Sequence, residues 1–471
     1  MFVRKLKNRS GSFCVQVIAK YAGKYKVIKT FGSTKNADQL EQLLLLAKQY
    51  VSNPNNQLPL FSTLSKEDLA VKNAFEHLSN FNIRTVGPEL IFGKLFDAIG
   101  FQTVACGELL RHLVIARLSY PLSKLKTVNY LYRYQGLKLS EDTIYRFMDK
   151  LNNTYKKQIE EITYLHTRKL LGGKIVVVFY DMTTLYFEAE DEDDLRKIGF
   201  SKDGKFQQPQ IMIGLLVGKE GLPIGYDIFA GNKFEGHTLL PVLKKVEKKY
   251  HIGKPIVVAD SALLSKKNIE DLVKAGYQYI LGARIKNEAE EIKDAILTEA
   301  KTLYENEALK IIKSDGIKLI ITYSRKRSRK DAHNRETGIK KLKDRLRSGK
   351  LTKEHITNRG YNKFLTLDGE ISVAIDEDKI KKDKEWDGLK GYATNTKMSP
   401  EKVVEYYNHL WQIEQAFRIS KTDLRIRPIF HRLQKRIEAH ICIAFVAYAI
   451  IKELERLLRK GKTGLSVSAK W

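Results

Sequence analysis

The sequence contains little cysteine and no long apolar run. Its three cysteines, Cys14, Cys106 and Cys442, lie far apart, which excludes a disulfide framework and a thiolate zinc site. The longest uninterrupted apolar run is 441–451, about half of the roughly 20 residues that a membrane span needs. The basic N-terminus is no secretory signal, because Lys20 interrupts its apolar stretch. We therefore expect an intracellular protein in a reducing compartment, without a membrane partner.

Acidic residues are scarce relative to basic ones. The 471 residues include 83 Lys+Arg and 55 Asp+Glu, which gives a formal net charge of +28. Such an excess predicts a polyanionic partner, with nucleic acid as the first candidate. A ribosome-associated or merely basic soluble protein is the alternative. Hydrophobic residues make up 43% of the chain, enough for a core, and the length suggests roughly two to four domains.

The N-terminal part divides into two predicted segments. Residues 1–60 predict a small ββα module that is a candidate for DNA binding, with the Pro-containing stretch 52–60 as a linker. Residues 61–171 have a helical period. Within them, 123–151 predicts two helices, with Ser140 as the N-cap of the second. This pair is either a DNA-binding helix–turn–helix or an ordinary helical hairpin.

The remainder predicts an α/β domain with an interruption. Residues 172–284 alternate buried strands and amphipathic helices, as in a mixed sheet. Residues 285–396 predict a β-rich insertion, and its stretch 325–353 holds 13 Lys+Arg against 3 Asp+Glu. That stretch either contacts a DNA backbone or is a solvated loop. Residues 397–471 predict the C-terminal helices of the domain, and the ending 465–471 resembles the approach to another element.

Two predicted buried strands each lead into an aspartate. The run 175–181 ends in Asp181, and 255–260 ends in Asp260. An unpaired carboxylate is costly to bury, and catalytic groups of α/β sheets gather at strand ends. We therefore expect the two aspartates to share a divalent cation. For either aspartate alone, a turn or cap residue would be the simpler interpretation.

A predicted helix over 400–421 supplies a third carboxylate. Tyr407, Glu414 and Lys421 are spaced by seven residues, which returns to nearly the same helix face, and Arg418 lies one turn beyond Glu414. Apolar residues on the helix can pack it against the sheet. The alternative is a solvated, ion-paired helix face.

These patterns together resemble a known enzyme family. The matching stretches are YDMTTLYFE (180–188), GNKFEGH (231–237), VVADSALLS (257–265), GYATNT (391–396) and LWQIEQAFRISKTDLRIRPIFH (410–431). They are similar to DDE transposases of bacterial insertion sequences, in the branch whose final helix carries a Tyr-Arg-Glu-Lys signature. The resemblance covers about 172–450 and implies an RNase H-like catalytic domain. Leu410 stands where that signature has its arginine, and His409 or Arg418 could replace it.

The resemblance also implies roles for individual residues. Asp181, Asp260 and Glu414 would be the catalytic triad, holding two Mg²⁺ or Mn²⁺ ions. Lys421, Arg418 and Tyr407 would bind DNA phosphates. Glu235 and His237, in the second matching stretch, would support the site.

The resemblance implies function and partners as well. It implies metal-dependent cleavage of double-stranded DNA at element ends and strand transfer into target DNA. A homodimer is expected, because two ends must be joined, and the location would be the bacterial cytoplasm at the nucleoid. The alternatives are a catalytically inactive, sequence-specific DNA-binding protein and an RNase H-like nuclease that only hydrolyses.

Overall fold

The computed structural model describes residues 1–52, 84–261, 265–305, 307–313, 316–349, 351–357, 359–368 and 372–467. The chain forms two compact units, Met1–Ser79 and Asn80–Trp471, each of which has its own contacts. The expected boundaries near 171 and 284 therefore do not separate compact units. The expected linker at 53–60 and the first part of the helical segment, 61–83, lie outside the described residues.

The N-terminal unit is a three-stranded antiparallel sheet with one helix. Its elements are β1 (Phe2–Lys7), β2 (Phe13–Tyr21), β3 (Lys24–Thr34) and α1 (Ala37–Ser52), with the strands in the order β1-β2-β3. Val15 and Val17 of β2 pack against Leu40 and Ala47 of α1. The ββα prediction was incomplete, because β1 was missed. That edge strand is rich in Arg and Lys and mostly exposed, so only its pairing with β2 reveals it.

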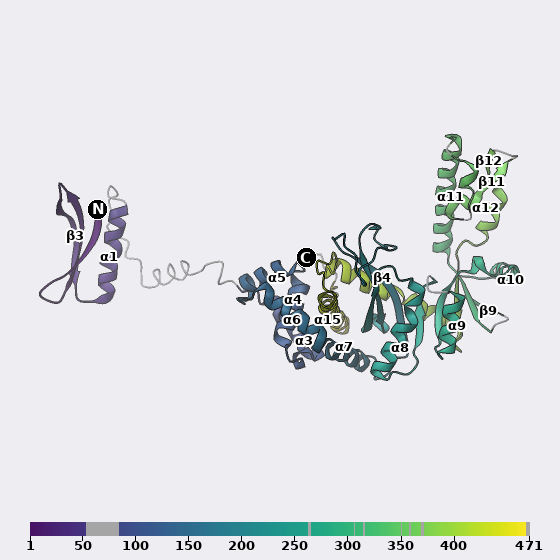
Figure 1. The fold of residues 1–471 in the computed structure, drawn as a ribbon, viewed down its shortest axis with the longest axis horizontal. Helices are drawn as coiled ribbons and strands as arrows, with labels where there is room; N and C mark the ends of the chain where they lie inside the picture. The colour runs from purple at the N-terminus through teal and green to yellow at the C-terminus, as the bar shows by residue number, and fades with distance from the viewer. Residues whose placement is uncertain are drawn as a thin grey trace. The chain divides into compact units, whose positions relative to one another are not determined.

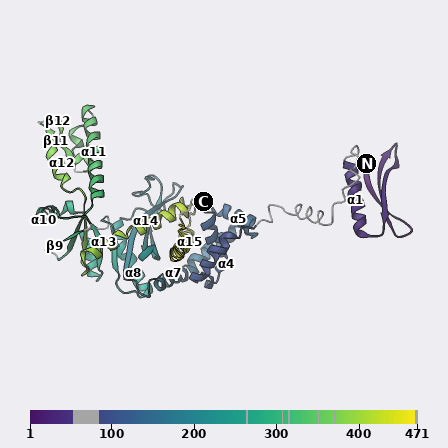
Figure 2. The same ribbon diagram turned by 180° about the vertical axis from the view of Figure 1, so that it is seen from behind.

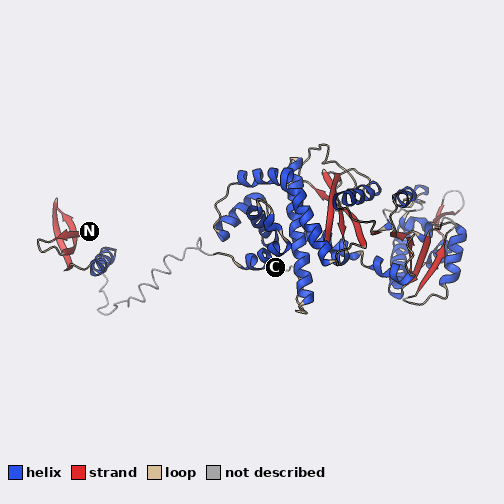
Figure 3. Cartoon of the chain, turned by 90° about the horizontal axis from the view of Figure 1, so that it is seen from below, coloured by secondary structure: helices blue, strands red, loops and turns tan. Residues whose placement is uncertain are grey.

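The second unit begins with helices that pack on the long C-terminal helix. These are α3 (Lys94–Ile99), α4 (Gly107–Ser119), α5 (Lys124–Tyr130), α6 (Glu141–Lys150) and α7 (Lys156–Leu170), with short helical turns between them. Helix α15 (Gln434–Lys460) contacts α3, α4, α6 and α7, and it lies between them and the sheet (Figure 3). The helical segment and the sheet therefore share one hydrophobic core.

The predicted helix pair at 123–151 is confirmed. Helix α5 and the turn Leu131–Gln135 lead into α6, and the hydroxyl of Ser140 accepts a hydrogen bond from the backbone N–H of Thr143 at 3.2 Å. Ser140 is thus the N-cap of α6, as the sequence predicts. DNA binding by this pair stays a prediction.

An eight-stranded mixed sheet forms the centre of the second unit (Figure 1). Its strands, in spatial order, are β6 (Pro223–Ala230), β5 (Gln210–Val217), β4 (Val177–Tyr186), β7 (Ile256–Ala259), β8 (Tyr279–Ala283), β13 (Leu389–Thr394), β10 (Lys318–Tyr323) and β9 (Ala308–Ile312). The β4–β7 and β7–β8 pairs are parallel, and the other pairs are antiparallel.

Helices cover both faces of this sheet. Because side chains alternate along a strand, Val177 and Phe179 of β4 face one core, while Val178 and Tyr180 face the other. Helices α13 (Pro400–Asn408), α14 (Trp411–Arg418) and α15 cover the first face. Helices α8 (Leu239–Tyr250), α9 (Lys266–Lys274) and α10 (Glu290–Ala300) contribute to the second core. Figure 2 shows α13, α14 and α8 from behind.

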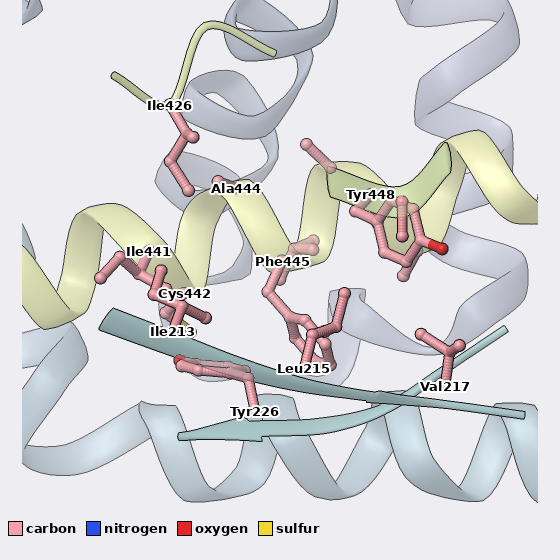
Figure 4. Packing of buried hydrophobic residues seen from close by; sticks show 14 of the residues in the cluster. Ile213, Leu215, Val217, Tyr226, Ile426, Ile441, Cys442, Ala444, Phe445 and Tyr448 are labelled. Atoms are coloured by element: carbon pink, nitrogen blue, oxygen red, sulfur yellow. The ribbon is translucent and has the colours of Figure 1, made fainter. Parts of the chain in front are cut away.

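Helix α15 is packed tightly against the antiparallel edge of the sheet. Figure 4 shows Phe445 and Tyr448 of α15 beside Leu215 of β5 and Tyr226 of β6. The rings of Tyr226 and Phe445 lie 4.8 Å apart, and the hydroxyl of Tyr448 donates to the carbonyl oxygen of Gly221 at 2.5 Å. These contacts hold the sheet in place against the helices of residues 94–170.

The segment 285–396 is not the β-rich insertion that the sequence predicts. Three of its strands, β9, β10 and β13, extend the central sheet, and the rest is mainly helical. The basic stretch forms the long helix α11 (Arg325–Arg347), which packs beside the hairpin β11 (Leu365–Asp368) and β12 (Ser372–Ile375) and is followed by α12 (Glu377–Lys384). A small core around Leu342 and Phe364 joins these elements. Trp386 is buried in the core of the second sheet face, so it is a core residue.

Candidate active site

The pairing of β4 with β7 brings the two aspartates together. The parallel register places Tyr180 opposite Ala259, so the residues that follow, Asp181 and Asp260, are neighbours. Asp260 follows directly after β7, as expected. Asp181 does not end its strand, because β4 continues to Tyr186 in its pairing with β5. Strand alternation places both carboxylates on the face that α13, α14 and α15 cover.

Tyr407 holds Asp260 rather than standing free for DNA. Its hydroxyl donates a hydrogen bond to Asp260 Oδ1 at 3.2 Å, and the same oxygen accepts from the backbone N–H of Ser261 at 2.6 Å. Burial, followed by the charge of Asp260, raises the pKa of Tyr407 above its ordinary value. Gly282 of β8 makes this contact possible, because a Cβ there would lie 2.5 Å from the Tyr407 hydroxyl oxygen.

Glu414 lies on the same face of the sheet, on a separate short helix. The predicted single helix over 400–421 is instead α13, α14 and the short helical turn Ile419–Asp423. The break occurs where His409 and Leu410 bond to carbonyls three residues back and Leu410 turns into the core at 8% exposure. Leu410 therefore packs the helix against the core. Glu414 itself is exposed.

Lys390 lies in the electrostatic field of both Asp260 and Glu414. This residue of β13 lies with its ammonium 4.5 Å from the centre of the Tyr407 ring. Burial lowers the pKa of Lys390, Arg327 acts in the same direction, and Asp260 and Glu414 both act to raise it. Glu414 and Asp260 thus share two electrostatic neighbours, Lys390 and Tyr407.

Lys202 neutralises the other side of the acidic pair. Its Nζ lies 2.8 Å from Glu235 Oε1 and 3.9 Å from Asp181 Oδ1, and it donates to the carbonyl oxygen of Met182 at 2.7 Å. Burial raises the pKa of Asp181 to about 6; Lys202 and the backbone N–H of Met182 oppose this, and Glu235 and Asp260 add repulsion. Glu235 thus lies near Asp181 and pairs with Lys202, and its supporting role stays a prediction.

The other predicted site residues lie apart from this cluster or are already engaged. Lys421 is 12% exposed in its side chain and lies 3.2 Å from Asp203, which also pairs with Arg427. Arg418 is exposed and lines a groove of about 270 Å³ beside α15. Burial raises the pKa of the neighbouring Asp423, and the charge of Arg418 opposes this rise. His237 is exposed and stacks edge-on against Phe234, with ring centres 5.4 Å apart.

Sequence reasoning missed Lys202 and Lys390. Lys390 stands one residue before the matching stretch 391–396, which was the available signal. Lys202 lies in the connection between β4 and β5, where a single lysine carries no pattern. Only the folded chain shows that its charge faces Asp181.

The aspartate pair has the chemistry of a site for a hard divalent cation. Its donors are all carboxylate oxygens, which Mg²⁺ and Mn²⁺ prefer, and burial together with repulsion from Glu235 and Asp260 raises the pKa of Asp181, so a nearby cation would favour its charged form. Within the described part of the chain, no three His, Cys, Asp or Glu side chains lie close enough to hold one ion. The adjacency and the carboxylate donors of Asp181 and Asp260 fit such an ion, whereas Glu414 forms no compact three-carboxylate set with them.

Comparison with known proteins identifies the family. The family model of the transposase DDE domain matches residues 172–450. A comparison with curated proteins found no match. No helix among the described residues is long and apolar enough to cross a membrane.

Three similar solved structures all have TM-scores below 0.5, so the family assignment rests on the family model. A piggyBac transposase synaptic complex with hairpin DNA is 10% identical, with 83% of this chain and 78% of that chain covered and a TM-score of 0.40. The Drosophila P element transposase strand transfer complex is 12% identical, with coverages of 91% and 88% and a TM-score of 0.20. The Mos1 transposase paired-end complex with the left transposon end is 10% identical, with coverages of 49% and 70% and a TM-score of 0.17. The match over 172–450, more than half of the chain, shows that this protein belongs to the family of transposases with a DDE domain.

Proposed function

We propose that this transposase cleaves double-stranded DNA at the ends of an insertion sequence and joins the ends to target DNA. The observation that supports this most is the adjacency of Asp181 and Asp260 across the parallel β4–β7 pair, on the sheet face covered by the helix of Glu414. Carboxylates from three separate parts of the chain thus lie on one face of the sheet, which supports a metal-dependent phosphoryl-transfer site.

The order of the first five strands supports an RNase H-like arrangement. The antiparallel meander β4, β5 and β6 lies on one side, and β7 and β8 follow in parallel on the other side of β4. The central strand β4 carries Asp181. We take this sheet, with the extension by β13, β10 and β9, as the catalytic domain.

Asp181, Asp260 and Glu414 would hold Mg²⁺ or Mn²⁺ as a pair of ions, with the two adjacent aspartates as the core of the site. Such ions, when bound, activate the attacking oxygen and stabilise the leaving oxygen of a phosphodiester. The chain's own residues prepare this site. Tyr407 orients the Asp260 carboxylate through its hydrogen bond, and Lys202 balances the charge of Asp181 and Glu235.

The proposed partners follow from the reaction. The substrates would be element ends and target DNA, two protomers would hold two ends together, and the protein would act at the nucleoid in the bacterial cytoplasm. Arg418 is exposed and free to contact a phosphate, whereas Lys421 would first have to leave Asp203.

The direct test is a cleavage and strand-transfer assay on DNA that carries the element's own ends. We expect product with Mg²⁺ and none with EDTA. Asp181→Asn, Asp260→Asn and Glu414→Gln should retain DNA binding and lose cleavage. Asp191→Asn, an exposed carboxylate in the β4–β5 connection, serves as the matched control and should cleave normally. Cleavage by all three site variants would refute the assignment.

A second candidate is a catalytically inactive DNA-binding protein. The observation that favours it is the lack, among the described residues, of three acidic side chains close enough for one metal ion. The same assay separates the candidates, since an inactive binder would retain end-specific binding without product. An RNase H-like nuclease would instead give cleavage without joined product.

A further inference from the structure

A second cluster of titratable side chains lies outside the candidate active site. Helices α4, α5 and α6 meet the segment 425–431 and α15 around a cavity of about 280 Å³. Arg117, Lys124, His431 and His440 line this cavity, and each is at most 9% exposed. A lysine or arginine cation that is buried in this way requires a compensating partner.

Two members of the cluster have such partners within the protein. Arg117 Nη1 donates to the carbonyl oxygens of Leu424 and Arg425 at 3.3 and 3.4 Å. His440 Nε2 lies 2.9 Å from the carbonyl oxygen of Ile426, and its Nδ1 lies 3.5 Å from Arg117 Nη2. This geometry requires a neutral His440 that donates from Nε2, in agreement with its lowered pKa. Arg117 and His440 thus form the inner wall of the cavity.

Lys124 has no partner of this kind. Among the described residues, no carboxylate lies within 4.0 Å of its ammonium and no oxygen accepts a hydrogen bond from it. Burial, followed by the charge of Arg117, lowers its pKa well below the ordinary value. The neighbouring His431 is no counterion, because burial lowers its pKa to about 3 and leaves it neutral.

The rest of the cavity lining does not supply the missing anion. Glu141 is the carboxylate of the described lining, but it is half-exposed and forms no ion pair with Lys124 or Arg117 in the described structure. At the rim, Phe430 is 65% and Leu125 57% exposed, and Arg425 adds a further cation. A cationic cavity beside an exposed aromatic ring is the combination by which proteins hold a strand of nucleic acid.

We propose that this cavity binds a phosphate group, held by the Lys124 ammonium and the Arg117 guanidinium. The DNA backbone is the favoured source, because the nucleoside attached to the phosphate would then lie against Phe430; this part rests on the proposed DNA transaction. A free phosphate would engage the same two cations. The chemistry shared by both sources is a dianionic or diester phosphate, whose negative charge would favour the protonated form of Lys124 and pair with Arg117.

The test compares Lys124→Met with Lys126→Met in the full-length protein. Both residues lie in α5, but Lys126 is exposed, so the control removes the same charge from the surface. Thermal unfolding is measured against inorganic phosphate, with chloride at equal ionic strength and without Mg²⁺. Salt titrations of DNA binding are measured in parallel, in the Asp181→Asn background, so that a loss of cleavage cannot affect either readout. Phe430→Ala then separates the two sources.

If DNA supplies the phosphate, Lys124→Met lowers the salt slope of DNA binding by about one unit, and Phe430→Ala weakens DNA binding. Lys126→Met then leaves DNA binding and its salt slope unchanged.

If free phosphate is the ligand, phosphate raises the unfolding temperature of the parent protein and of Lys126→Met but not that of Lys124→Met. DNA binding is then the same in both variants. An unchanged phosphate response and an unchanged salt slope in Lys124→Met would overturn the proposal. Should Lys124→Met fail to fold, a crystal of the parent protein soaked in tungstate decides: an anomalous peak in the cavity supports the proposal, and its absence refutes it.

Discussion

At the scale of single residues, the role of Tyr407 differs most from what its sequence position suggests. The resemblance implied a phosphate contact, but the hydroxyl is used on Asp260. Tyr407→Phe should therefore slow cleavage about tenfold, since a hydrogen bond to a charged group contributes about 1.5 kcal/mol or more. It should also raise the Mg²⁺ concentration for half-maximal rate and leave DNA affinity unchanged.

Two variants sharpen this measurement. Gly282→Ala should show the same defect, because the added Cβ would displace the Tyr407 hydroxyl. Tyr406→Phe, the adjacent phenol on α13, is the matched control and should behave as the parent protein. Weakened DNA binding in Tyr407→Phe, with normal metal dependence, would restore the phosphate role.

The raised pKa of Asp181 predicts a pH-dependent stability. The carboxyl ionises at an ordinary 3.8 in the unfolded chain and at about 6 in the folded one. Raising the pH between these values therefore favours the unfolded state, by about 3 kcal/mol at most. In EDTA, Asp181→Asn should unfold at a higher temperature than the parent at pH values above about 6. This advantage should vanish below about pH 4, whereas Asp191→Asn should show no effect at any pH.

The aspartate pair was predictable from the sequence because each aspartate follows an apolar run. Such a run is visible in the sequence without any knowledge of tertiary contacts. The sequence could not predict Lys202 or the Lys421–Asp203 pair. These contacts join residues that are far apart in the chain, and isolated charges carry no periodic pattern.

At the scale of secondary-structure elements, α11 depends on one buried ion pair. The guanidinium of Arg335 on this basic helix forms a bidentate pair with Asp387, with the two nitrogen–oxygen distances 2.6 and 2.5 Å, and it is 8% exposed. Arg335→Met leaves Asp387 buried without its partner and should cost about 3–5 kcal/mol. Hydrogen exchange should then accelerate first in α11 and α12.

Arg329→Met is the control for this prediction, because Arg329 lies on the exposed side of the same helix. It should leave hydrogen exchange unchanged. If α11 contacts DNA, this variant should lower the salt slope of DNA binding by about one unit. Equal protection of α11 in Arg335→Met and the parent would show that the ion pair does not hold the helix.

The elements that sequence reasoning missed share a physical cause. The break between α13 and α14 arises because Leu410 turns into the core, and no proline or glycine marks it. The basic stretch 325–353 lacks an apolar periodicity, so it suggested a loop, although arginine and lysine are good helix formers. Strands β5 and β7 and the first part of β4 were predictable because they are almost continuously apolar.

At the scale of the whole molecule, the N-terminal unit offers the simplest DNA-binding experiment. Residues 1–52 hold 10 Lys+Arg against 2 Asp+Glu, and the first part of β3 is exposed. A fragment of residues 1–80 should fold and bind element-end DNA with a steep salt dependence. A fragment extended to residue 170 is less suitable, because α3, α4, α6 and α7 lose α15 and expose their core.

Variants within that fragment locate the contact. Lys24→Ala combined with Lys26→Ala, on the β2–β3 hairpin, should lower the salt slope by about two units. Lys48→Ala, on α1, should change it little. A 1–80 fragment that prefers element ends no more than random DNA would remove this unit from end recognition.

The place of α15 in the core also sets the order in which a new chain can acquire its structure. The N-terminal unit has all of its described core once residue 52 has left the ribosome, but the second unit needs α15, which ends at Lys460. At about 5–20 residues per second, some 408 further residues take roughly 20–80 s to make. During that interval the folded part of the nascent chain is a basic module, because Asp181 and Asp260 are made before α14, which carries Glu414, and before α15, which completes the core. Binding can therefore precede catalysis in time as well as in mechanism.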